Sequence, residues 1–175
     1  MKLLNLKNKT ARKFIKNQRN VAERKKEFEL KAVKKIGVLA ELSLFETYDF
    51  TKRLADHLKV RHEDLKVFLF DTTGKGEAPG FYKTCSENDF GFFAKVKSEA
   101  LNRFLSIDFD LLINYCDASL LYPRIIMLKS ASKMRAGFED ELNFFNDIAV
   151  HAERNDIDTF NSELAKYLKI LKLID

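Results

Sequence analysis

Short apolar runs alternate with amphipathic segments along most of the chain, and this alternation constrains the fold more than any other feature. Three runs are apolar at nearly every position, which is typical of strands buried on both faces of a sheet, and two weaker runs follow. The predicted strands cover residues 36–42, 65–70, 109–115, 134–138 and 147–151. Apolar residues at helical spacing predict helices over residues 47–58, 94–105, 119–128 and 157–173.

Strands that alternate with helices form parallel βαβ units with right-handed crossovers. We therefore predict an α/β fold, a single three-layer Rossmann-like open sheet of about five mainly parallel strands. Thr47 is the expected N-cap of the first of these helices, and Pro123 fits a helix only within its first turn. Three Gly and one Pro within residues 72–80 predict a loop after the second strand.

Positive charge is concentrated at the start of the chain. Residues 1–35 contain thirteen Lys and Arg against three Glu, whereas residues 36–175 contain eighteen Lys and Arg against twenty-three Asp and Glu. A basic segment thus precedes a mildly acidic body. The sequence predicts a basic amphipathic N-terminal helix or arm over residues 1–35 and an α/β domain over residues 36–175.

The basic segment also has a narrow apolar stripe, because Phe14, Val21 and Phe28 recur every seven residues with Ala11 and Ile15 beside them. Such a helix could bind RNA phosphates, lie on an anionic membrane, or pack its stripe on its own domain. A membrane is the less favoured partner, because the stripe lacks crowded Trp and Leu. The candidate residues for an acidic partner are Lys9, Arg12, Lys13, Lys16, Arg19, Arg24 and Lys25. Because the stripe is so narrow, we expect residues 1–20 to be only weakly held on the domain.

Polar residues follow the predicted strands, where ligands bind in open parallel sheets. The candidate pocket consists of Asp71, Asn114, Asp117 and His151. The alternative is that loops after strands are polar because they are solvated and cap the next helix, which would explain Asp117 adequately.

The sequence lacks the motifs of several common nucleotide-binding and metal-binding sites. The Gly-rich loop is not a Walker A loop, because Gly76 follows Lys75 where Ser or Thr is needed, and no glycine fingerprint for a dinucleotide follows the first strand. The histidines and cysteines show no metal-ligand spacing, so we expect no metal and no cofactor. A pair of Cys116 or Cys85 with His151 is conceivable, although cysteines in apolar runs are usually buried free thiols. Without a signal peptide or an apolar run of about 20 residues, we expect a cytoplasmic protein.

Two resemblances accompany these patterns. The Lys-rich start, residues 35–39, 109–114 and 129–138 together resemble an uncharacterised bacterial family that is known only as a domain of unknown function. Residues 110–114 and 130–138 are also similar to the acceptor half of heptosyltransferase-type glycosyltransferases. The latter enzymes need a second, nucleotide-sugar domain, so this likeness implies shared architecture rather than shared chemistry.

The charge split suggests a non-enzymatic module that docks through residues 1–30 on an acidic partner, RNA or a ribonucleoprotein above others. The alternative is a small-molecule binding protein or modest transferase at the carboxyl edge of the sheet. The oligomeric state stays open.

Overall fold

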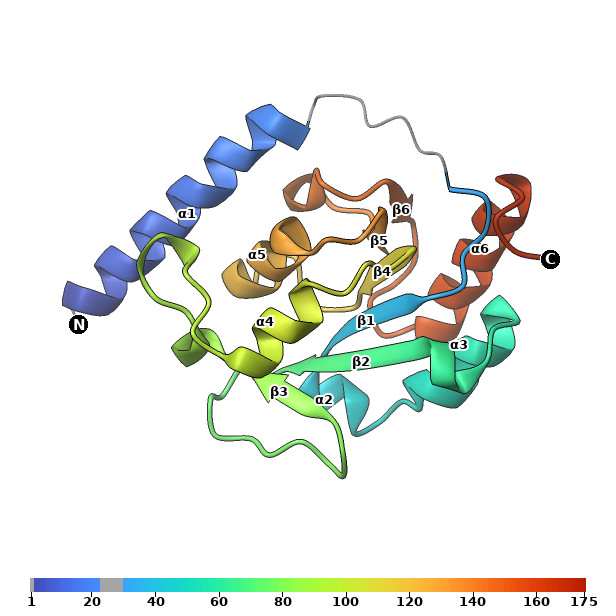
Figure 1. Ribbon diagram of the computed structural model, residues 1–175, viewed down its shortest axis with the longest axis horizontal. Coiled ribbons are helices and arrows are strands. Elements are labelled where there is room, and N and C mark those ends of the chain that lie inside the picture. Colours follow the sequence, from blue (N-terminus) through green and yellow to red (C-terminus); the bar gives the residue numbers. More distant parts are fainter. Residues whose placement is uncertain (1, 23–29) are drawn as a thin grey trace.

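The computed structural model describes residues 2–22 and 30–175, and these residues form a six-stranded parallel sheet in the order β3-β2-β1-β4-β5-β6 (Figure 1). The strands are β1 (Ile36–Glu41), β2 (Leu65–Phe70), β3 (Lys83–Cys85), β4 (Leu111–Asn114), β5 (Met134–Phe138) and β6 (Ile148–Val150). The α/β prediction is confirmed, and this strand order places the topological switch point between β1 and β4.

The strand β3 is the one that the sequence did not predict. It is three residues long, begins with an exposed lysine and pairs only with Phe68–Phe70 of β2. The bounds of β2 and β5 agree with the predicted runs, whereas β4 and β6 are shorter than predicted. β1 stops at Glu41 because Leu42 begins the short helix α2 (Leu42–Phe45).

The predicted helices are present; the first three begin later than predicted, whereas the last begins at Ile157 as predicted and ends earlier. They are α3 (Phe50–Leu58), α4 (Glu99–Leu105), α5 (Leu121–Lys129) and α6 (Ile157–Ile170). Asp49, not Thr47, caps α3 by accepting a hydrogen bond from the backbone N–H of Lys52. α4 begins later than predicted because residues 92–94 form a 3-10 turn, η3 (Phe92–Ala94), in which Phe93 has a φ of 56°. Pro123 lies in the first turn of α5, as predicted.

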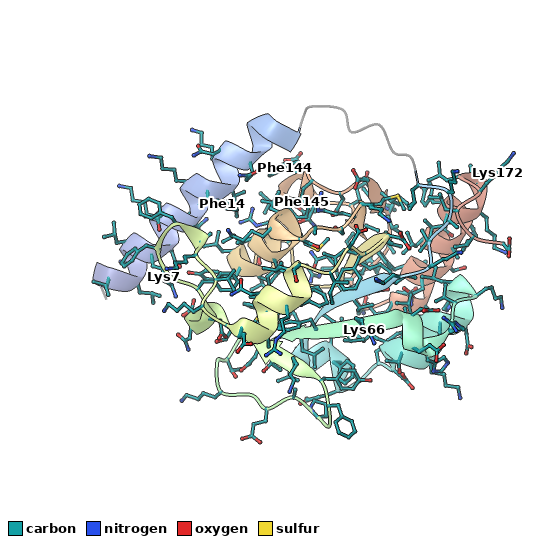
Figure 2. The ribbon with its side chains drawn as sticks, viewed as in Figure 1. Lys7, Phe14, Lys66, Phe144, Phe145 and Lys172 are labelled. Carbon is teal, nitrogen blue, oxygen red and sulfur yellow. The ribbon has the colours of Figure 1, made fainter. Side chains whose placement is uncertain are left out.

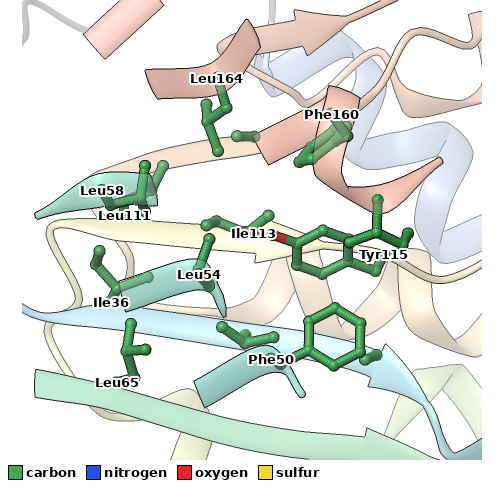
Figure 3. Packing of buried hydrophobic residues seen from close by; sticks show 14 of the residues in the cluster. Ile36, Phe50, Leu54, Leu58, Leu65, Leu111, Ile113, Tyr115, Phe160 and Leu164 are labelled. Atoms are coloured by element: carbon green, nitrogen blue, oxygen red, sulfur yellow. The ribbon is translucent and has the colours of Figure 1, made fainter. Parts of the chain in front are cut away.

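Helices cover both faces of the sheet. α3 and α6 pack on one face, where Phe50, Leu54, Phe160 and Leu164 contact strand residues such as Ile113 (Figure 3). A buried chain of hydrogen bonds crosses the same layer: the Tyr115 hydroxyl donates to Asn161, whose amide donates to the Tyr48 hydroxyl, which donates to Asp158. The polar groups buried there are therefore paired with one another.

The opposite face is covered by α4, α5 and the N-terminal helix α1 (Lys2–Ala22), which lies beside α5 along one side of the molecule (Figure 1). Ala11 and Ile15 of α1 are buried in the core of this face. Phe14, the first residue of the predicted stripe, is half-buried with the Lys129 ammonium 4.6 Å from its ring centroid. The side chain of Val21 is not among those described, and Phe28 lies outside the described residues.

Polar contacts also attach α1 to the domain. The Tyr122 hydroxyl donates to Asn8 at 2.7 Å, the backbone N–H of Phe93 donates to Thr10 at 3.0 Å, and the Lys7 ammonium donates to the Glu87 carbonyl at 2.7 Å. Of the arrangements that the sequence left open, the structure therefore has α1 packed on its own domain. Residues 2–22 do not form a free arm.

Candidate functional site

The four residues of the predicted pocket have separate partners. Asp71 follows β2 and holds the loop after it: one carboxylate oxygen accepts from the backbone and hydroxyl of Thr73, and the other accepts from Gly76 N at 2.6 Å. Burial alone would raise the pKa of Asp71, but these bonds outweigh it and leave that pKa lowered. The role of this carboxylate is thus to fold residues 71–76 onto the edge of the sheet.

Asn114, at the end of β4, is 1% exposed and belongs to the face covered by α5. Its Oδ1 accepts from the backbone N–H of Cys116, while its Nδ2 has no acceptor among the described residues. The amide of Asn146 is also buried without a described partner, and a Cβ added to Gly137 would lie 2.7 Å from its Nδ2. Asn146 was not predicted, because nothing in the sequence relates it to Asn114.

Asp117 lies at the switch point between β1 and β4, where Arg154 bridges two carboxylates. One Arg154 nitrogen is 2.9 Å from the Asp117 carboxylate, and another is 3.5 Å from that of Glu41. Glu41 also accepts from the backbone N–H of Asp117 at 2.8 Å. Hydrogen bonds from Ser119 and the charge of Arg154 lower the pKa of Asp117. The charged side chains at the switch point therefore pair with one another through Arg154, a residue that the sequence did not single out.

His151 follows β6 with its side chain 94% exposed, and its Nδ1 lies 2.9 Å from the Glu139 carboxylate. Its described partner is Glu139 and not Asp71, Asn114 or Asp117. The thiols of Cys85 and Cys116 are free and buried, as expected, and burial raises both of their pKa values, so neither is a ready nucleophile.

The outward face of α1 is the strongest concentration of unpaired charge. Lys9, Arg12, Lys13 and Lys16 are all exposed, and no described residue forms an ion pair with any of them. Their spacing of three and four residues puts them on one side of the helix over roughly 10 Å. Arg19 belongs to α1 but its side chain is not described, and Arg24 and Lys25 lie outside the described residues.

Two features are absent from the described part of the chain: a cluster of metal ligands and a helix that could span a membrane. Residues 2–22 and 30–175 contain no cluster of His, Cys, Asp and Glu that could hold a metal ion. Within the same ranges, no helix combines the length and the apolar character that crossing a membrane requires.

A protein-family model, described as "Family of unknown function (DUF6913)", matches residues 7–171. Neither a curated protein nor a solved structure matches the chain. The match confirms the resemblance to an uncharacterised family, and nothing in these comparisons supports the likeness to glycosyltransferases.

Proposed function

As the chain belongs to DUF6913, a family of unknown function, we propose from its geometry that it is a non-enzymatic module that docks on RNA, alone or on a ribonucleoprotein surface, through the outer face of α1. The supporting observation is that α1 is held on the domain by Ala11 and Ile15, which leaves four cations exposed without ion-pair partners among the described residues. We also propose that the protein is cytoplasmic.

A fixed helix suits this task better than a free one. Because the domain already orders α1, binding RNA does not have to meet the conformational entropy of folding a helix. Four cations within roughly 10 Å can contact neighbouring phosphates of one strand. Such contacts are made to the RNA backbone and do not distinguish one base from another. The affinity for RNA should therefore depend strongly on salt concentration and little on base sequence.

The alternative site at the carboxyl edge has one supporting observation, the buried Asn114 Nδ2 without an acceptor among the described residues. Asp71, Asp117 and His151 are engaged by Thr73, Arg154 and Glu139 respectively. We therefore rank a small-molecule or transferase site second.

The test compares two charge variants of the full chain by fluorescence anisotropy with labelled oligouridine at low salt. In the first, Lys9, Arg12, Lys13 and Lys16 are replaced by Gln; in the control, the equally exposed Lys52, Lys66, Lys75 and Lys169 are replaced by Gln. Both variants lose the same charge. We expect the first to bind on the order of tenfold more weakly than the control, because only it removes clustered phosphate contacts.

Equal loss in the two variants would mean that net charge alone attracts RNA and would contradict the proposal. A vesicle arm addresses the membrane alternative, since Leu3, Leu4 and Leu6 of α1 are also exposed. Binding to phosphatidylserine vesicles without binding to oligouridine would assign the basic face to a membrane instead.

A further inference from the structure

A pocket of about 400 Å³ lies where α1, α5 and the loop after β5 meet. α1 contributes Arg12 and Lys16, α5 contributes Arg124, and the loop contributes Glu141 and Phe144. Figure 2 shows Phe144 on the side of the molecule that α1 covers. The volume is within the range of pockets that bind small organic molecules.

Arg124 is the unusual residue of this pocket. It is 8% exposed, yet its one described hydrogen bond runs from Nε to the Leu120 carbonyl at a long 3.4 Å. No described residue forms an ion pair with it. Burial lowers the pKa of Arg124, and the nearby positive charge of Arg12 lowers it further. The negative charge of Asp140 offsets this lowering only in part. A guanidinium that is largely shielded from water and has no carboxylate within ion-pair distance favours a bound anion as its partner.

The charges of the pocket indicate what this anion is. Arg12, Lys16 and Arg124 face one carboxylate, that of Glu141, so the lining has an excess of two positive charges. A phosphate monoester carries a charge of about −1.5 to −2 at pH 7 and fits the fork of a guanidinium, whereas a single carboxylate leaves one charge unbalanced. The pocket is also larger than a phosphate, and Ile15, Leu142 and Phe144 give it an apolar wall.

We propose that this pocket binds a phosphate monoester of a small organic molecule, with the phosphate against Arg124, Arg12 and Lys16 and the organic body against Ile15 and Phe144. This site shares Arg12 and Lys16 with the RNA face but differs from it in its dependence on the buried Arg124. The phosphate can belong to a free metabolite or to the 5′ end of an RNA, and both present the same group to Arg124.

The test is isothermal titration of the full chain with adenosine 5′-monophosphate, inorganic phosphate and adenosine, and of the Arg124→Met variant with the same probes. We expect the monophosphate to bind more tightly than either of its parts, and Arg124→Met to weaken it on the order of tenfold or more. Because Met removes an unpaired buried charge, the thermal midpoint of this variant should be unchanged or higher. Lys52→Gln, at an exposed position outside the pocket lining and the RNA face, should bind as the wild type does.

Unchanged binding by Arg124→Met, or no binding of the monophosphate by the wild type, would overturn the proposal. A large fall in thermal midpoint for Arg124→Met would also overturn it, because Arg124 would then be a structural residue. Arg12→Gln should weaken binding of the monophosphate to a similar extent, because Arg12 also lines the pocket. A second arm compares oligouridine with and without a 5′-phosphate: an Arg124-dependent preference for the phosphorylated strand assigns the monoester to an RNA end, and no preference assigns it to a free molecule. The RNA proposal is unaffected by either result, because Arg124→Met leaves Lys9 and Lys13 in place.

Discussion

Gly37, the second residue of β1, shows how tightly single residues are placed between the sheet and the helices. A Cβ at this position would lie 2.8 Å from a Leu112 methyl group and 2.9 Å from the Phe109 ring, both of which are fully buried. Neither side chain has space to move away, because the interior is close-packed. The strand therefore needs glycine here for packing, with no requirement for an unusual φ.

Replacing Gly37 with Ala should lower the free energy of unfolding by about 1–3 kcal/mol, the usual cost of overpacking a core. Urea denaturation measures the change. Gly91→Ala is the control, because the nearest atom to its Cβ would be 3.5 Å away, and it should be neutral or slightly stabilising. Equal stability of Gly37→Ala and the wild type would show that β1 can shift away from Phe109.

Asp110 connects the start of β1 to β4. Its carboxylate accepts from the backbone N–H groups of Lys34 and Lys35 and from the Lys133 ammonium at 2.8 Å. Burial by itself would raise the pKa of Asp110, but these three bonds outweigh it and lower the pKa. A carboxyl group whose pKa is lowered by folding stabilises the native state above its unfolded pKa of about 3.9, and this contribution is lost as the pH falls through the folded value.

Asp110→Asn should therefore cost about 1–3 kcal/mol of unfolding free energy at pH 7, since one of the donors loses its acceptor. The difference from the wild type should shrink when the same urea titration is repeated below about pH 3. Asp108→Asn is the matched control, as Asp108 is 66% exposed and lies 3.5 Å from the same lysine. A cost that does not change with pH would mean that the charge of Asp110 contributes nothing.

At the scale of elements, the sequence predicted what local pattern determines and missed what distant residues determine. The continuous apolar runs located β1, β2 and β4, because a strand buried on both faces is apolar at nearly every position. β3 was missed because a three-residue edge strand that begins with Lys83 has no such pattern. The docking of α1 was left open because its anchors, Tyr122 and Glu87, lie about a hundred residues away in the chain.

The expectation of a weak hold over residues 1–20 considered only the stripe. With Ala11 and Ile15 buried and Asn8 bonded to Tyr122, α1 is an integral part of one face. Hydrogen exchange should therefore show protection in α1 that is lower than in β1 and β4 but well above that of an exposed loop. Exchange as fast as that of an unstructured peptide would contradict this packing.

Ile15→Ala should lower the unfolding free energy by about 2 kcal/mol and increase exchange in α1 more than in β4, because the cavity lies under the helix. Leu3→Ala, at a position that is 73% exposed on the same helix, should change neither quantity. Faster exchange throughout the sheet would show that α1 and the sheet open as one unit.

At the scale of the molecule, the basic start of the sequence becomes a helix with one face on the domain and one basic face in solvent. α1 directs Ala11 and Ile15 into the domain and presents Lys9, Arg12, Lys13 and Lys16 to solvent. The candidate pocket was less predictable, because the sequence identifies residues that follow strands but not their partners. Arg154 neutralises Asp117, and Thr73 engages Asp71, through contacts that only the folded chain reveals.

The salt dependence of RNA binding tests the role of α1 most directly. For a single strand, the slope of log affinity against log salt concentration is about −0.7 for each phosphate neutralised, so the four cations should contribute about 3 to the slope of the wild type. We predict that replacing Lys9, Arg12, Lys13 and Lys16 by Gln reduces the slope by about 2–3, while the control at Lys52, Lys66, Lys75 and Lys169 keeps it. A slope that is the same in all three proteins would contradict RNA docking through α1.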